Sequence, residues 1–184
     1  MLIYTIGHSN RSLDEFLNML RGHQIHQLLD VRTAAGSRRN PQFGHAALSR
    51  ALEVQGINYL RLPELGGFRK PRADSRNTGW RNDSFRGFAD YMETTQFEEG
   101  LSKLLELAKA GKTSVMCSEA VPWRCHRSLI ADALSVRGEE VRHIMSVIKA
   151  DEHRLTPFAK VDGTEIWYPP EAGTVLGARK ITTG

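Results

Sequence analysis

The sequence contains only two cysteines in 184 residues, so no disulfide framework holds this fold together. Such sparse cysteine use is typical of the reducing cytosol, and we expect a cytoplasmic protein. No apolar run approaches the roughly 20 residues that a transmembrane helix needs, which argues against a membrane protein. The first residues, MLIYTIGHSN, lack the basic stretch and apolar core of a signal peptide.

Motifs of several well-known enzyme classes are also missing. The first predicted strand is not followed by GxGxxG, and no GxxxxGK[ST] occurs, which argues against a common dinucleotide-binding fold and a P-loop ATPase. The GxSxG of α/β-hydrolases is absent as well. Cys117 and Arg124 are one residue too far apart for the phosphate-binding loop of protein tyrosine phosphatases.

Charge is unevenly distributed along the chain. The 25 Lys and Arg outnumber the 21 Asp and Glu, a formal net charge of +4. Residues 32–86 hold ten Arg and one Lys against four acids, so this segment carries +7 and the remainder −3. Because guanidinium is a planar fork suited to phosphate and carboxylate, the segment indicates an anionic small molecule or nucleic acid as partner. The alternative is a solvated face whose arginines pair with acids.

Hydrophobic periodicity predicts alternating strands and helices through the first 145 residues. We expect strands at 2–6, 25–31, 57–62, 113–117 and 141–145, and helices at 12–22, 46–55, 85–92, 97–110 and 126–136. Strands and helices that alternate at this spacing form right-handed crossovers and a parallel sheet. We therefore predict a three-layer, Rossmann-like α/β domain with a mainly parallel sheet of about five strands.

Three segments fall outside this alternation. Residues 63–84 are polar and rich in Gly, Pro and Arg, and irregular stretches of that length are usually functional or disordered. An Asp-Gly pair at 162–163 between two β-prone runs predicts a small C-terminal β-hairpin within 157–169. The predicted organisation is a single domain with an α/β core (1–150), an appended hairpin packed on it (151–170) and a flexible tail (171–184).

Reactive side chains follow almost every predicted strand. Because ligands bind outside the carboxyl ends of parallel strands, these side chains predict a site at one edge of the sheet. The residues predicted for catalysis are His8, Cys117, Glu119, Cys125 and His126. The residues predicted to bind an anionic substrate are Ser9, Asp30, Arg32, Arg38, Arg39 and Arg127.

The two cysteines admit four interpretations. A helix N-terminus favours the thiolate form, which makes Cys125 a candidate reactive group. Cys117 is an alternative nucleophile, with Glu119 or His8 as its base. A metal site that adds His126 or His8 to the cysteines is a third interpretation, although the spacing matches no familiar zinc pattern, and we assign no metal ligand or cofactor from the sequence. Finally, both thiols fit the usual role of free cysteines as small buried apolar residues.

A set of motifs resembles one bacterial family over nearly the whole chain. The motifs are TIGHS (5–9), DVR (30–32), SRRNPQF (37–43), LGG (65–67), GWRN (79–82) and MCSEAVPWRCHR (116–127). Together they resemble the bacterial domain of unknown function 488 family, chiefly through the pattern C-x-E-x-x-P-x-x-C-H-R. The resemblance implies the predicted fold and the location of the site, and it implies no reaction.

These observations support three hypotheses about function. The first is an enzyme that acts on a phosphate-bearing substrate, a nucleotide or nucleic acid, through the Cys, His, Glu and Arg groups at the strand ends. The second is a nucleic-acid-binding module without catalysis, in which residues 63–86 follow the phosphate backbone and Trp80 stacks on a base. The third is a metal- or thiol-based sensor.

Overall fold

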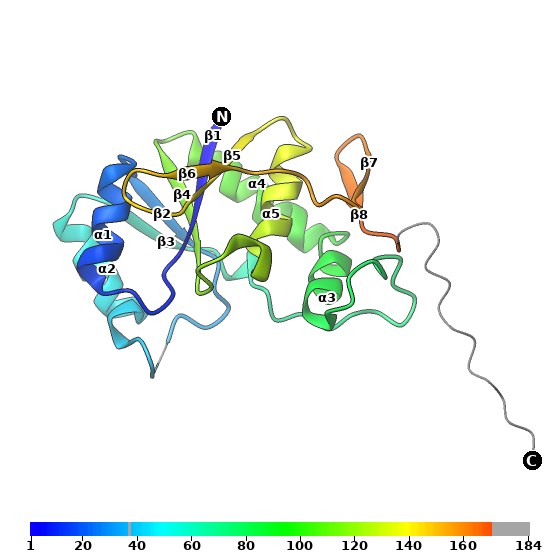
Figure 1. Ribbon diagram of the computed structural model, residues 1–184, viewed down its shortest axis with the longest axis horizontal. Helices are drawn as coiled ribbons and strands as arrows, with labels where there is room; N and C mark the ends of the chain where they lie inside the picture. The colour runs from blue at the N-terminus through cyan, green and yellow to red at the C-terminus, as the bar shows by residue number, and fades with distance from the viewer. Residues whose placement is uncertain (37, 171–184) are drawn as a thin grey trace, which may run out of the picture.

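The main sheet of the protein has six strands in the order β3-β2-β4-β1-β5-β6, as seen in a computed structural model that describes residues 1–36 and 38–170 (Figure 1). The strands are β1 (Leu2–Gly7), β2 (Gln27–Asp30), β3 (Asn58–Arg61), β4 (Thr113–Cys117), β5 (Glu140–Ile144) and β6 (Ala150–Glu152). All pairings are parallel except that of β5 with β6. The predicted α/β class with a mainly parallel sheet is confirmed.

Helices cover both faces of this sheet and complete the predicted three layers. On one face lie α1 (Leu13–Gly22) and α2 (His45–Val54), and on the other lie α3 (Asp83–Tyr91), α4 (Thr95–Ala108) and α5 (Arg127–Ser135) (Figure 1). Short 3₁₀ helices η1 (Pro41–Phe43), η2 (Pro63–Leu65) and η3 (Pro122–Arg124) each begin at a proline, whose fixed φ suits a first helical position. Within the described residues, no helix is long and apolar enough to cross a membrane.

The strand order places a topological switch point between β1 and β4. These strands are neighbours, with Gly7 paired to Cys117, yet the chain leaves β1 for α1 on one face and leaves β4 for α5 on the other. The two connections diverge, and such a divergence opens a crevice at the carboxyl ends of the strands. Gly7 is needed here, because a Cβ would lie 1.7 Å from the carbonyl oxygen of Glu119.

The C-terminal part adds a sixth strand and the predicted hairpin. The strand β6 was not predicted because the sequence Ala-Asp-Glu shows no apolar alternation, and it spans the predicted domain boundary at residue 150. The hairpin pairs β7 (Lys160–Asp162) with β8 (Glu165–Trp167), and Gly163 takes a φ of +58° in the turn. The predicted tail at 171–184 lies outside the described residues.

The irregular stretch at 63–84 is packed against α3 and the C-terminal segment. Asn77 is fully buried, and its side-chain oxygen accepts a hydrogen bond from the Tyr168 amide at 2.9 Å. Arg72 and Arg76 both form ion pairs with Glu93, at 2.5 and 2.8 Å. Acids thus neutralise part of the positive charge of residues 32–86. This agrees with the alternative interpretation, in which arginines of a solvated face pair with acids.

Asp132 of α5 is a buried acceptor that ties this helix to the segment before and after the hairpin. Its carboxylate accepts hydrogen bonds from His153 Nε2 (2.8 Å), the Thr156 amide (3.0 Å) and hydroxyl (2.7 Å), and the Tyr168 hydroxyl (2.9 Å). The other ring nitrogen of His153 contacts His143 Nε2 at 2.9 Å. No role was predicted for His143 or His153, because Asp132, the partner of His153, lies 21 residues away in the chain.

Acid is expected to destabilise the fold through His143. Burial, followed by the neighbouring His153 and Arg127, lowers the pKa of His143 to about 3, below the usual 6.5. Between these values the unfolded chain binds a proton that the folded chain does not, so the free energy of unfolding falls as the pH falls through this window. Urea unfolding at a series of pH values measures the slope. His143→Gln is expected to reduce the dependence of the free energy of unfolding on pH in this window. An unchanged pH dependence would contradict this role of His143.

Candidate functional site

An open pocket of about 530 Å³ lies at the switch point between β1 and β4. Its walls come from residues after β1, after β2, after η2, at the start of α3 and between β4 and α5. The structure brings to this pocket His8, Arg32, Cys117, Glu119, Cys125 and His126. All five residues predicted for catalysis therefore line one cavity, together with one of the predicted anion-binding arginines.

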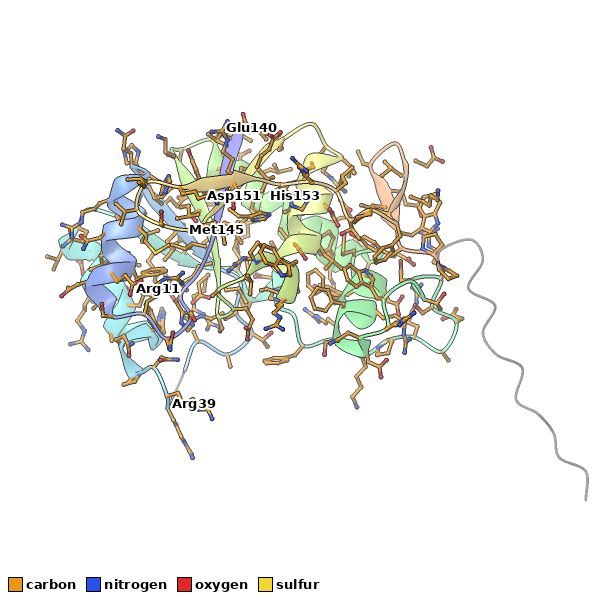
Figure 2. All side chains as sticks on the ribbon, viewed as in Figure 1. Arg11, Arg39, Glu140, Met145, Asp151 and His153 are labelled. Carbon is orange, nitrogen blue, oxygen red and sulfur yellow. The ribbon has the colours of Figure 1, made fainter. Side chains whose placement is uncertain are left out.

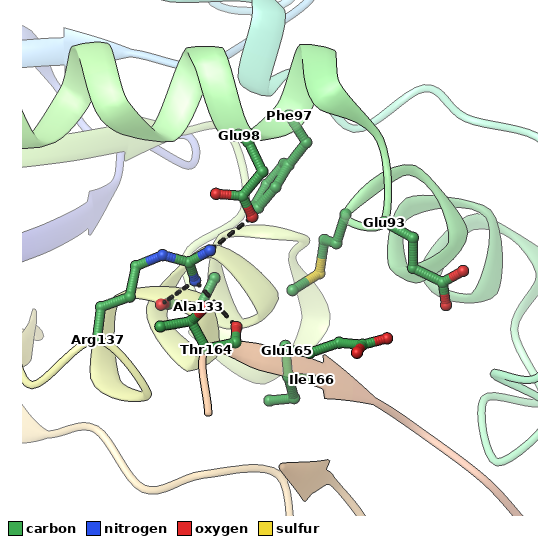
Figure 3. Close-up of a pocket in the computed structure, with 9 residues that line it drawn as sticks. Glu93, Phe97, Glu98, Ala133, Arg137, Thr164, Glu165 and Ile166 are labelled. Carbon is green, nitrogen blue, oxygen red and sulfur yellow. Dashed lines mark hydrogen bonds and ion pairs between the residues drawn. The ribbon is translucent and has the colours of Figure 1, made fainter. Parts of the chain in front are cut away.

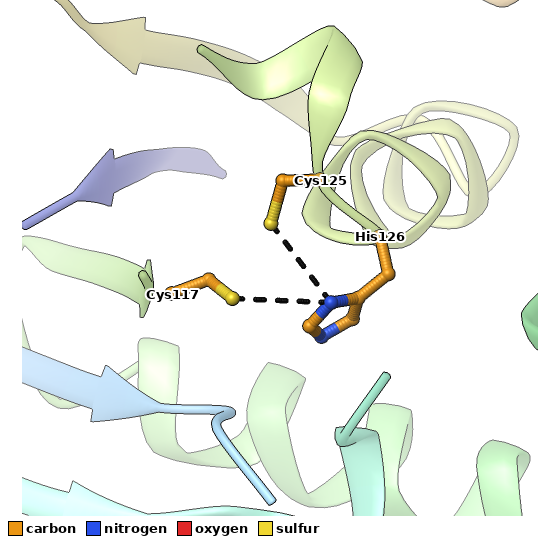
Figure 4. Close-up of side chains that lie close together, drawn as sticks. All are labelled: Cys117, Cys125 and His126. Carbon is orange, nitrogen blue, oxygen red and sulfur yellow. Dashed lines mark hydrogen bonds between the residues drawn. The ribbon is translucent and has the colours of Figure 1, made fainter. Parts of the chain in front are cut away.

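Cys117, Cys125 and His126 form a compact cluster in the pocket wall (Figure 4). Cys117 ends β4, while Cys125 and His126 join η3 to α5. The two sulfur atoms lie 3.8 and 3.9 Å from His126 Nδ1, and all three atoms lie within 4.8 Å of one another. Two thiols and an imidazole nitrogen thus meet at one point on the pocket surface.

The surroundings shift the pKa values of the two thiols in opposite directions. The neighbouring Cys117 thiol lowers the pKa of Cys125, and the charge and backbone amide of Arg127 act in the same direction against burial. The interaction with Cys125, together with burial, raises the pKa of Cys117 well above its usual range. Of the two thiols, Cys125 is therefore the one that forms a thiolate more readily.

The ring of His126 is oriented by contacts with distant parts of the chain. Its Nε2 donates a hydrogen bond to the carbonyl oxygen of Leu65 at 3.1 Å, and its face packs against Phe88 with ring centroids 4.9 Å apart. This bond leaves the lone pair of Nδ1 directed at the two sulfur atoms. Gly67 makes room for the ring, since a Cβ there would lie 2.4 Å from Nδ1.

Arg127 lies beneath the pocket wall and is 1% exposed. Its guanidinium donates to the carbonyl oxygens of Glu119 at 2.8 Å and Ala120 at 2.7 Å. These bonds fix the loop that carries Cys117 and Glu119 to the start of α5. Arg127 was predicted to bind an anion, but it does not line the pocket, and its contacts indicate that it shapes the loop and favours the Cys125 thiolate.

Arg32 is held in the pocket floor by the buried carboxylate of Asp30. Two parallel bonds join them, from Nε to Oδ1 at 2.9 Å and from a terminal nitrogen to Oδ2 at 2.7 Å. Tyr59 donates a further hydrogen bond to Asp30 at 2.5 Å. Such a bidentate pair fixes the plane of the guanidinium, and Asp30 therefore positions Arg32 from below the cavity.

His8 is held by bonds on both ring nitrogens. Nδ1 donates to the carbonyl oxygen of Ser9 at 2.7 Å, and Nε2 accepts a hydrogen bond from Arg32 at 3.2 Å. Burial is the main cause that lowers the pKa of His8 to about 4, so the ring is neutral at pH 7. Because Arg32 occupies its remaining lone pair, His8 is better suited to position Arg32 than to accept a proton.

Three of the residues predicted to bind an anion lie away from the pocket. Arg38 and Arg39 are exposed and absent from its lining, and Arg39 points away from the body of the protein (Figure 2). Ser9 adopts a positive φ of 53°, and its hydroxyl bonds Asn10 at 3.3 Å. These residues follow strands in the sequence, but the loops turn their side chains elsewhere.

Phe68 and Arg124 are among the lining residues that were not predicted as site residues. Phe68 lines the cavity with a ring that is 83% exposed. Arg124 also lines it, is exposed, and makes no side-chain hydrogen bond or ion pair with another residue that the structure describes. The available signals were the turn at Gly66-Gly67 before Phe68 and the position of Arg124 in the segment between the two cysteines.

A smaller pocket of about 190 Å³ lies between α4, α5 and the hairpin (Figure 3). Its central side chain is Arg137, which pairs with Glu98 at 2.5 Å and donates to the carbonyl oxygens of Ala133 and Thr164. The cation is therefore satisfied by the protein itself. The pocket at the switch point remains the candidate site.

Comparison with known proteins identifies the family of the chain without naming a reaction. The sequence model described as "Domain of unknown function DUF488" matches residues 12–134. This region includes Arg32 and the segment from Cys117 to Arg127, whereas His8 precedes it and the hairpin follows it. No curated protein and no solved structure shows significant similarity to the chain. Because the match spans more than half of the sequence, the chain belongs to the DUF488 family.

Proposed function

We propose that the protein is an enzyme that acts on a phosphate-bearing substrate, a nucleotide or a nucleic acid strand, in the pocket at the switch point. The observation that carries this proposal is the convergence of two thiols, two imidazoles, a carboxylate and two arginines on one open cavity. These groups come from separate connections of the sheet and meet where α/β folds bind their ligands.

Arg124 and Phe68 support the choice of substrate. The exposed guanidinium of Arg124, which has no partner among the described residues, can bind a phosphate group through two parallel hydrogen bonds. An exposed aromatic ring on the same cavity offers a face on which a nucleobase can stack. A nucleotide has both groups, and the cavity volume of about 530 Å³ is within the range of small-molecule sites.

In this proposal, chemistry takes place at the cluster of Cys117, Cys125 and His126. Among the described residues that line the pocket, Glu119 is the only carboxylate, and it serves as the general acid or base. Arg32, held by Asp30 and His8, stabilises negative charge on the substrate.

Three of the five arginines of residues 63–86 form ion pairs with acids, which favours an enzyme over a simple nucleic-acid-binding module. Arg72 and Arg76 pair with Glu93, and Arg86 pairs with Asp83. A backbone-binding surface needs cations that are free to replace the counterions of phosphates. Arg124, which forms no ion pair with another described residue, instead lines the pocket.

The experiment is a turnover assay with a substrate panel: nucleoside mono-, di- and triphosphates and short single-stranded RNA and DNA, with products separated by liquid chromatography. At least one member should be converted. Arg124→Ala should raise the KM for that member by about 10- to 100-fold, the value of one charge-assisted contact. Arg50→Ala, on the exposed side of α2, is the matched control and should change KM little. Absence of product from every member would contradict the proposal.

A further inference from the structure

We propose that Cys117, Cys125 and His126 bind a zinc ion with one coordination position open to the pocket. This inference deepens the proposed function: that the substrate or a water molecule occupies the open coordination position rests on the proposed function. The binding site itself rests on three observations of the cluster: the spacing of its donor atoms, the orientation of the imidazole and the way the chain holds the three side chains.

The spacing of the donor atoms is close to that of ligands around tetrahedral zinc. Zinc–sulfur and zinc–nitrogen bonds of known length place neighbouring sulfur and nitrogen ligands about 3.6 Å apart, and two sulfurs about 3.8 Å apart. In this protein the sulfur atoms lie 3.8 and 3.9 Å from Nδ1, and all three atoms lie within 4.8 Å of one another. A zinc ion therefore requires the side chains to move by at most about 1 Å.

The imidazole already has the tautomer that a metal ligand needs. His126 Nε2 donates to the Leu65 carbonyl oxygen at 3.1 Å, which leaves Nδ1 unprotonated and facing the sulfurs. Metal-binding histidines characteristically donate their second ring nitrogen to a carbonyl or carboxylate in this way. Contact with Phe88 and the absence of a side chain at Gly67 hold the ring in the same orientation.

The chain also holds the cysteines firmly and supplies positive charge beside them. Cys117 is the last residue of a central strand, and the Cys125 amide donates to the Pro122 carbonyl oxygen at 2.9 Å within η3. Arg127 is buried beside both thiols, and the ion pairs of the described residues do not include it. A buried cation without an acidic partner favours the two thiolates that metal binding requires.

The donor set selects the metal and indicates how it is used. Two thiolates and an imidazole suit zinc, whereas magnesium, calcium and manganese prefer oxygen ligands. Structural zinc sites have four protein ligands, whereas three protein ligands are typical of catalytic sites that leave a position for water or substrate. All three residues line the open cavity, so the remaining position faces the space that also contains Glu119 and Arg124.

Elemental analysis of the full chain, purified without an affinity tag and without chelators, tests the site. We expect about one zinc ion per chain, and less than about one-tenth of that in Cys117→Ser, Cys125→Ser and His126→Ala. His8→Gln, which removes a histidine of the same pocket outside the cluster, is the matched control and should keep its zinc. Gly67→Ala, whose Cβ meets the His126 ring, should weaken zinc binding by about 10- to 100-fold.

Cobalt titration of the metal-free wild-type protein keeps the test independent of variants that fail to fold. Cobalt in the site should produce thiolate-to-metal charge-transfer absorption and the visible bands of a tetrahedral centre. If the wild-type protein holds no zinc and shows neither feature, the metal site is wrong, even if a panel member is turned over. If zinc binds as expected but no panel member is converted, the metal site stands and the proposed function fails.

Discussion

Replacing either Cys117 or Cys125 with serine is expected to lower turnover by about a thousandfold or more while the protein stays folded. A serine hydroxyl is a poor substitute for a thiolate, both as a nucleophile and as a ligand for a soft metal ion. Because serine is close to cysteine in size, the melting temperature should differ by only a few degrees from that of the metal-free wild type, roughly the effect of a 1 kcal/mol change. Turnover of the preferred panel member and thermal unfolding are measured on the same preparations.

The control for this pair is Val115→Ala, two residues before Cys117 on the same strand and in the same apolar core. Val115 is fully buried, so its truncation should lower the free energy of unfolding by about 1 to 3 kcal/mol through lost contacts and a cavity. Turnover per folded molecule should remain close to that of the wild type. If the cysteine variants lose as much stability as Val115→Ala and their lost activity follows the unfolded fraction, the thiols are structural residues.

Replacing Asp132 with alanine is expected to lower the free energy of unfolding by about 3 to 5 kcal/mol. The carboxylate is fully buried and accepts four hydrogen bonds, from His153, from the amide and hydroxyl of Thr156, and from Tyr168. Its removal leaves these donors buried without an acceptor, which costs more than the mean value of the bonds themselves. Urea unfolding followed by circular dichroism measures the change.

Asp151→Ala is the matched control for this substitution. Asp151 lies on β6 and pairs with Lys149 at 3.2 Å, and both side chains are substantially exposed, so the change should stay within about 0.5 kcal/mol. The change in the free energy of unfolding caused by Asp132→Asn should lie between those of Asp132→Ala and Asp151→Ala, since an amide keeps one acceptor oxygen. An Asp132→Ala protein as stable as Asp151→Ala would show that the network does not attach the C-terminal segment to α5.

The central parallel strands β1, β2 and β4 were predictable because both of their faces are buried. The segments Leu2–Gly7 and Thr113–Cys117 are almost entirely buried, so they appear in the sequence as short continuous apolar runs bounded by glycine or polar residues. The edge strand Ala150–Glu152 lacks this signal because its side chains are half-buried or exposed. Its place in the sheet depends on three backbone pairs with β5 rather than on a hydrophobic pattern.

The edge of the sheet that carries the pocket was also predictable, but the geometry within it was not. The Cys, His, Glu and Arg residues at the strand ends pointed to the region in which the structure has the pocket of about 530 Å³. The orientation of His126, however, depends on Leu65, which is 61 residues away, and Arg32 is bonded to His8 across 24 residues. Local sequence does not encode such contacts, and for the same reason it did not distinguish the buried Arg127 from the free Arg124.

The net charge of residues 32–86 also depends on contacts with distant parts of the chain, which local sequence does not show. Arg76 lies within residues 32–86, but its partners Glu93 and Glu165 lie outside that segment. Counting charges along the chain therefore overstated the positive surface, because folding brings acids from elsewhere onto it. Within residues 1–36 and 38–170, the Arg124 guanidinium at the pocket has no hydrogen-bond or ion-pair partner, and the proposed substrate contact rests on it.

The central claim is that the substrate binds at the carboxyl ends of β1 and β4. Its most direct test is a titration of the ¹⁵N-labelled protein with the panel member that is turned over, followed through the backbone amide signals. The proposal predicts that the largest saturable shifts occur at Gly67, Phe68, Ser118, Glu119 and Arg124. Shifts confined to residues 69–81, or to the pocket around Arg137, would contradict it.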